Sequence, residues 1–214
     1  GSDGGSLALD TSTTNGAINL DVSISRSGVW YGFSSFTANA GTGNITFSGA
    51  NLASNWAVNA ETLTGALNIS SGFKSGGQLN LNATGNSTIA GNLGLASSTT
   101  NTWTVNPNLT MTVSGNISGT SAAITKIGTG TLILSGSANT YNGSTTVNAG
   151  TLQLSGNISS SALTLNSGGI ISVGTNASVA KYNTSSITIG AGSGYIFTIG
   201  SNASGTTAGT DFDQ

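Results

Sequence analysis

A short segment of the chain repeats itself after twenty residues. Gly-Thr-Leu-Ile-Leu-Ser-Gly at residues 130–136 returns as Gly-Thr-Leu-Gln-Leu-Ser-Gly at residues 150–156. A period of about twenty residues is typical of one coil of a β-solenoid, in which each coil stacks on the one before it. We therefore expect Leu132 to lie one coil away from Leu152, with both side chains pointing into a narrow core.

Short strands with apolar side chains at alternate positions recur along the chain, and Gly, Asn or Ser turns separate them. Residues 45–47, 79–81 and 163–165 are examples of this pattern. Alternation with period two predicts strands that bury one face. Because Glu, Gln, Lys and Arg are scarce and no helical spacing is sustained, we expect an all-β fold with almost no helix. The internal repeat favours a parallel coil over an antiparallel sandwich or barrel.

Charged residues are unusually few. The chain has four Lys and Arg and six Asp and Glu among 214 residues, against 33 Gly and 24 Asn. Its surface must therefore meet water through amides and hydroxyls. A net charge of −2 offers no cationic surface for a phosphate backbone, so we expect no nucleic-acid partner. Regularly placed aliphatic residues argue against a disordered chain of the same composition.

The residue types that carry most site chemistry are missing. The chain has no His and no Cys, which excludes a serine triad, a thiol nucleophile and the usual zinc sites. Asp211 and Asp213 are interpreted as solvated groups near the end of the chain. Asp10, Asp21 and Glu61 could come together in a calcium site only by chance of coil phase. We expect no catalytic residue, no metal and no cofactor, and hence no enzyme.

One stretch resembles a known repeat. Residues 124–156 are similar to the autotransporter-associated β-strand repeat, also called the passenger-associated transport repeat. The resemblance lies in Lys126, residues 128–132, residues 139–141, Gly143, residues 145–147 and residues 150–152. It implies a parallel right-handed β-solenoid, here of nine or ten coils, in a passenger region that is exported to the bacterial surface through a C-terminal barrel. It also implies an extracellular or cell-surface location and, for some copies, a role in export.

The domain organisation follows from this resemblance. Residues 1–40 are expected to form an N-terminal cap or irregular first coils, and residues 41–210 a β-solenoid that contains the repeat. Residues 211–214 are interpreted as a truncated end, which makes the chain a fragment of a longer protein. No stretch approaches the roughly 20 apolar residues that a membrane-spanning helix needs.

Four aromatic residues are candidates for contact with a ligand. Residues 26–36 group several aromatics and are interpreted first as a lid over the first coil. The alternative is a glycan-binding platform, to which Trp30, Tyr31, Trp56 and Trp103 would contribute.

Three further expectations concern polar residues. Lys126 is interpreted as a solvated charge at the rim of a coil. Gly128 and Gly130 are expected to supply positive φ at coil corners. Outward threonines raise the idea of an ice-binding face, but the Thr positions do not form a repeated Thr-x-Thr array, which gives that idea no support.

The favoured function is structural: a rigid rod on the order of 45 Å long at about 4.8 Å for each coil. An adhesin or glycan-binding module is the first alternative. A self-assembling extracellular fibre subunit, joined end to end, is the second.

Overall fold

A computed structural model of the chain describes residues 5–11, 13–14, 16–21, 33–48, 60–69, 73–75, 77–173 and 184–197. Within these ranges every regular element is a β-strand. The strands are β1 (Gly5–Asp10), β2 (Ile18–Asp21), β3 (Phe33–Ser48), β4 (Ala60–Ile69), β5 (Phe73–Lys74), β6 (Gln78–Ala83), β7 (Ser87–Ile89), β8 (Leu93–Gly94), β9 (Thr100–Val105), β10 (Thr110–Val113), β11 (Ile117–Ser118), β12 (Ala123–Ile127), β13 (Thr131–Leu134), β14 (Thr145–Val147), β15 (Gly150–Leu154), β16 (Ile158–Leu165), β17 (Gly169–Val173), β18 (Thr184–Ile189) and β19 (Gly194–Phe197).

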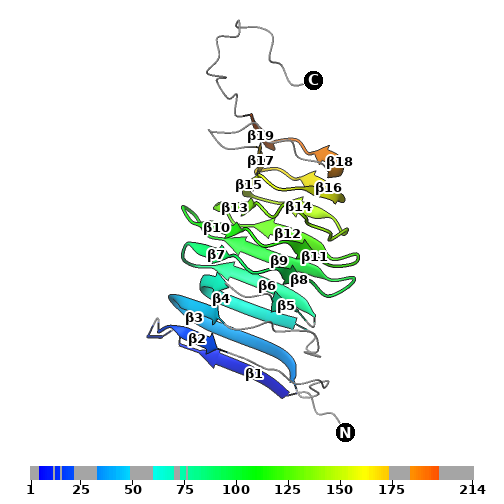
Figure 1. The fold of residues 1–214 in the computed structure, drawn as a ribbon. Coiled ribbons are helices and arrows are strands. Elements are labelled where there is room, and N and C mark those ends of the chain that lie inside the picture. The colour runs from blue at the N-terminus through cyan, green and yellow to red at the C-terminus, as the bar shows by residue number, and fades with distance from the viewer. Residues whose placement is uncertain are drawn as a thin grey trace, which may run out of the picture.

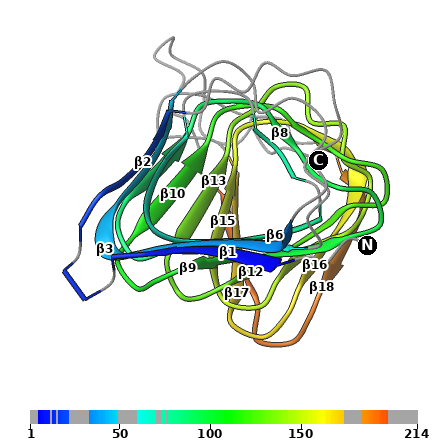
Figure 2. The same cartoon turned by 90° about the horizontal axis from the view of Figure 1, so that it is seen from below.

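The strands wind into a parallel β-solenoid, as the internal repeat predicted. Strands β4, β6, β9, β12, β14, β16 and β18 stack to form a first face. Strands β7, β10, β13, β15, β17 and β19 stack on the end of β4 to form a second face, and β5, β8 and β11 form a short third sheet. Each of these pairings is parallel. Figure 1 shows the layers one above another, and Figure 2 shows the same coil along its axis.

The number of regular turns is smaller than expected. The solenoid has about six turns, against the nine or ten expected from the sequence. The expected number came from dividing the whole chain of 214 residues by about twenty to twenty-five residues for each coil. Strands β1, β2 and β3 continue the two ladders below β4, and β18 and β19 continue them above β16 and β17.

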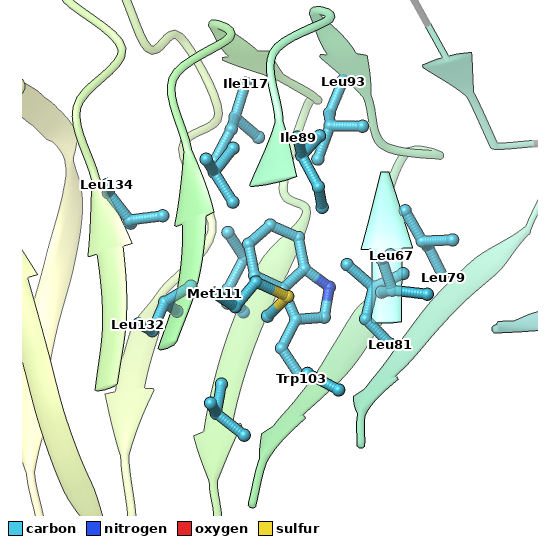
Figure 3. Close-up of a cluster of buried hydrophobic side chains, with 14 of the residues drawn as sticks. Leu67, Leu79, Leu81, Ile89, Leu93, Trp103, Met111, Ile117, Leu132 and Leu134 are labelled. Atoms are coloured by element: carbon cyan, nitrogen blue, oxygen red, sulfur yellow. The ribbon is translucent and has the colours of Figure 1, made fainter. Parts of the chain in front are cut away.

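The register of the internal repeat is confirmed. Leu132 pairs with Leu152, and Leu134 pairs with Leu154 in the next coil. All four side chains are fully buried. Inward positions along neighbouring strands are likewise apolar, so one continuous core runs along the axis. Figure 3 shows a section of this core around Met111.

Glycines form a column where successive coils come closest. A Cβ atom on Gly115 would lie 1.9 Å from the carbonyl oxygen of Gly91. On Gly136 it would lie 2.5 Å from the carbonyl oxygen of Gly115, and on Gly156 it would lie 2.1 Å from that of Gly136. No side chain fits at these distances, so the column Gly91, Gly115, Gly136 and Gly156 permits close backbone stacking. Gly136 and Gly156 are the last residues of the two segments that repeat after twenty residues.

Candidate functional site

The structure tests one of the four aromatic residues proposed as ligand contacts. Trp103 lies in β9 with none of its surface exposed, and its side chain points into the core in Figure 3. A ligand on the surface of the solenoid therefore does not reach it. Its indole Nε1 is buried without a hydrogen-bond partner, which costs about 1–3 kcal/mol in stability. Trp30, Tyr31 and Trp56 lie outside the described residues.

Lys126 is not the solvated rim charge that was expected. It occupies an inward position of β12, and its side chain is fully buried. In the ladder it pairs with Trp103 of the coil below and Val147 of the coil above. The alternation of β12 places it inward, since Ile124 two residues earlier also points to the core.

Three backbone carbonyls surround the buried ammonium group. Lys126 Nζ donates to the carbonyl oxygens of Gly128 at 2.8 Å and Ile127 at 3.3 Å, both at the corner that follows β12. It also donates to the carbonyl oxygen of Ala149 in the next coil at 3.0 Å. These three acceptors match the three N–H bonds of an ammonium group. Gly128 has φ +76°, as expected at a corner, and this conformation turns the chain directly after Lys126, whereas the expectation of a positive φ at Gly130 is wrong.

Burial changes the acidity of this group. Desolvation lowers the pKa of Lys126 from 10.5 to about 8. The carbonyl oxygens offset only a part of the cost of burying this charge, because each carries a partial negative charge, whereas a carboxylate would carry a full one. Lys126 therefore links two coils through a contact whose strength depends on its protonation state.

A second polar contact crosses the core between neighbouring coils, as a row of hydrogen-bonded side chains. The hydroxyl of Tyr141 lies 2.8 Å from Thr145 Oγ1, which lies 2.8 Å from Ser161 Oγ in the next coil. Ser161 Oγ in turn donates to the carbonyl oxygen of Gly143 at 2.7 Å. Burial raises the pKa of Tyr141 to about 12, while its hydrogen bonds to Thr145 and Ser161 act in the opposite direction.

One buried asparagine ties three coils together. Asn139 Oδ1 accepts the backbone N–H of Ile117 in the coil below at 2.8 Å. Its Nδ2 donates to the carbonyl oxygen of Gly136 at 2.8 Å and to that of Asn157 in the coil above at 2.9 Å. Asn101 bridges three coils in the same way. These amides provide hydrogen-bond partners for backbone groups of the neighbouring coils.

Sequence reasoning did not find these buried polar contacts. Lys126, Asn139 and Tyr141 were recognised only as elements of the repeat, and nothing in their local pattern names their partners. The inward phase of Lys126 was nevertheless readable, because Ile124 precedes it by two residues. Its high polarity suggested solvent exposure instead, which is the usual preference of lysine.

The described residues offer little for chemistry. No group of three His, Cys, Asp or Glu side chains within them is placed to hold a metal ion. Asp10 and Asp21 end β1 and β2, which pair with opposite ends of β3, while Glu61 lies in β4. Asp211 and Asp213 lie outside the described residues. The described residues contain no helix that is long and apolar enough to span a lipid bilayer.

Comparison with known proteins identifies the part of the chain that contains Lys126, Tyr141 and Asn139. A family model described as the passenger-associated-transport-repeat matches residues 124–154. Searches of curated proteins and of solved structures gave no match to the chain. The matched residues run from β12 to β15 and include the three polar groups that join neighbouring coils. The chain thus carries a passenger-associated transport repeat, of the kind found in autotransporter passengers, within a parallel β-solenoid.

Proposed function

We propose that the chain is a structural passenger segment, a rigid stalk or module of an autotransporter-like protein at the bacterial surface or secreted from the cell. The observation that carries this proposal is the continuous parallel pairing from β4 to β17 around an apolar core. Each coil contacts mainly its neighbours, so the stack resists bending and transmits force along its axis. The matched repeat supports the assignment to an exported passenger.

The proposed role requires no catalytic group. Its mechanism is the hydrogen-bonded ladder, reinforced inside by the contacts of Lys126, Tyr141 and Asn139. A surface of amides and hydroxyls keeps such a rod hydrated with few charges. The chain has no Cys, so disulfides do not contribute to its stability.

Two measurements test this function. Small-angle X-ray scattering of the chain is expected to give the profile of an elongated particle whose axis is longer than its cross-section. In cells that make the natural full-length protein, external protease is expected to reach this segment without lysis. A compact scattering profile, or protection of the segment until cells are broken, would refute the proposal.

A second candidate role, end-to-end assembly into a fibre, has one observation in its favour. The large exposed apolar side chains lie together in the last described layer: Ile187 and Ile189 of β18 and Ile196 of β19. Ile187 and Ile189 stack on the buried Leu163 and Leu165 of β16, and no described strand pairs with the other edge of β18. An open edge with apolar side chains accepts another strand, here from a second copy.

Light scattering over a concentration series tests this second role. Self-association that weakens in Ile187→Ser and Ile189→Ser variants is the expected result. A chain that stays monomeric at all concentrations, or variants that associate as strongly as the parent chain, would remove the fibre role. The aromatic glycan platform keeps no support from Trp103, which is buried.

A further inference from the structure

A column of outward threonines runs along the first face of the solenoid. Thr125 in β12 pairs with Thr102 of the coil below and with Thr146 of the coil above. Its half-exposed side chain lies between the buried Ile124 and Lys126, which places it on the outer surface. The threonine column consists of Thr37, Thr62, Asn80, Thr102, Thr125, Thr146, Thr164 and Thr188, one residue from each successive layer.

A second column lies two residues further along the same strands. Thr64 pairs with Asn82, and Asn82 pairs with Thr104. Near the other end, Asn166 Nδ2 donates to Asn148 Oδ1 at 2.7 Å. The second column consists of Asn39, Thr64, Asn82, Thr104, Ile127, Asn148 and Asn166. Six of its seven members are Thr or Asn. In most layers, therefore, one strand has a Thr or Asn in each column, with a single inward residue between the two.

The two columns are not a Thr-x-Thr array, because only two layers have Thr at both positions, Thr62 with Thr64 and Thr102 with Thr104, and the columns have no fixed period in the sequence. Thr125 and Thr146 are 21 residues apart, Thr146 and Thr164 are 18 apart, and Thr164 and Thr188 are 24 apart. Changes in coil length occur in the corners and leave the register of the strands intact. A fixed sequence period does not exist, but the stacked coils produce one in space.

The hydroxyls of the threonine column are not used by the protein itself. Within the described part of the chain, the side chains of Thr102, Thr125 and Thr146 make no hydrogen bond to other residues. Threonines elsewhere do: Thr99 Oγ1 donates to the carbonyl oxygen of Ala96, and Thr145 Oγ1 is bonded inside the core. These three hydroxyls are therefore free for an external partner, whereas Asn80 Oδ1 in the same column accepts the backbone N–H of Thr102.

The array is regular and stiff. Parallel strands lie about 4.8 Å apart, and every second residue of a strand recurs after about 6.7 Å, which sets the two repeats of the surface. Threonine is β-branched, so its χ1 angle is restricted and little side-chain entropy is lost on binding. Figure 1 shows the central strands of this face, β9, β12, β14 and β16, stacked directly above one another.

The chemistry of the array selects its partner. No member of either column is charged, so the partner must be neutral. Thr and Asn side chains recur in two directions, along the strands and from coil to coil, so a partner with its own planar lattice can meet many of them at once. The two repeats are close to the oxygen–oxygen repeats on a prism face of hexagonal ice. Neither column contains an aromatic ring, the group on which sugar rings usually stack.

We propose that the first face of the solenoid, formed by the two columns, binds the surface of ice. Hydroxyl and amide groups hold a layer of ordered water, and the threonine methyls keep that layer in place between them. This layer continues into the crystal lattice and anchors the rod to it. The site is distinct from the structural role of the core, because the columns point outward and make no contribution to packing inside.

The test uses the whole chain and ice as the probe. Inhibition of ice recrystallisation in a frozen sucrose film is measured against protein concentration. Thr146→Lys places a long charged side chain in the middle of the threonine column. Thr112→Lys is the matched control, because Thr112 is a half-buried outward threonine between buried residues of β10, on the second face. Thr146→Val keeps the shape and the β-branch while removing the hydroxyl.

The expected result is inhibition by the parent chain and by Thr112→Lys at the same concentration. Thr146→Lys is expected to need at least about tenfold more protein, which corresponds to about 1.4 kcal/mol of lost interaction. Thr146→Val is expected to lie between them, and circular dichroism confirms that each variant is folded. A parent chain without effect on ice, or equal losses in Thr146→Lys and Thr112→Lys, overturns the proposal. Retention on insoluble cellulose or chitin without an effect on ice overturns it in favour of a polysaccharide surface.

Discussion

Replacing Lys126 with methionine is expected to remove a pH dependence of stability that few other groups in this chain can produce. The folded state lowers the pKa of Lys126 from 10.5 to about 8, so it holds this proton less tightly than the unfolded chain does. Between pH 8 and pH 10.5 the unfolded chain therefore binds more protons. The free energy of unfolding must then rise with pH in that window.

The magnitude follows from the two pKa values. One pKa unit is worth about 1.4 kcal/mol, so lowering the pKa from 10.5 to about 8 gives a complete effect of at most about 3.5 kcal/mol. Between pH 7 and pH 9.5 the linkage relation gives a rise of about 2 kcal/mol for Lys126. The background is favourable for this measurement, because the chain has no His and no Cys to titrate in the same range.

Urea unfolding followed by circular dichroism at pH 7, 8, 9 and 9.5 measures the effect. The parent chain is expected to gain stability as the pH rises, and Lys126→Met is expected to keep a constant value. At pH 7 the variant loses a buried charge but leaves the carbonyl of Ala149 without its donor, and these two changes oppose each other. The pH slope is therefore more informative than the absolute stability.

Leu132→Met is the matched control, because it changes a buried core side chain and leaves Lys126 in place. It should keep the full pH slope and lose less than about 1.5 kcal/mol at any pH. A parent chain whose stability is constant or falls between pH 7 and pH 9.5 would refute the argument that Lys126 is buried without a carboxylate. A rise that persists in Lys126→Met would assign the slope to another group.

Three further predictions concern the core and the corners. Burial raises the pKa of Tyr141 to about 12, so the parent chain should lose stability as the pH rises from about 10 to 12, and Tyr141→Phe should lose less in urea titrations at those pH values. Gly156→Ala should cost about 1–3 kcal/mol in urea unfolding, because its Cβ would meet the backbone of Gly136; an unchanged midpoint would contradict the close stacking. Leu132→Ala and Leu152→Ala should each cost about 2–5 kcal/mol and should not be additive in the double variant, since the two residues are paired neighbours; additivity would place them apart.

The fold was predictable where the repeat in the sequence has the length of one coil in the structure. Leu132 and Leu152 are twenty residues apart in two nearly identical segments, and the structure pairs them in adjacent coils. The alternation of apolar residues predicted the strands, and the shortage of helix formers predicted a fold with almost no helix. The number of regular turns was overestimated, because the period of one pair of coils was applied along the whole chain.

The polar features were not predictable in the same way. The partners of Lys126 lie at a corner of its own coil and at Ala149 of the next coil, and their position depends on how the backbone turns at Gly128. The threonine column was hidden because coil lengths differ, with 18 residues from Thr146 to Thr164 and 24 from Thr164 to Thr188. Both features depend on alignment between coils, and a single strand carries no information about that alignment.

The scarcity of charge follows from the same alignment. In a parallel stack each outward residue lies about 4.8 Å from its counterparts above and below, so a charged column would place like charges at that distance in every layer. Each such contact costs about 1 kcal/mol even in water, and the cost accumulates along the rod. Thr and Asn stack without this penalty, and Asn can also bond from one coil to the next, as Asn80 Oδ1 does with the N–H of Thr102. The composition that first separated this chain from an ordinary globular protein is therefore a consequence of stacking equivalent positions. The same stacking makes the outer surface a neutral, repeating array.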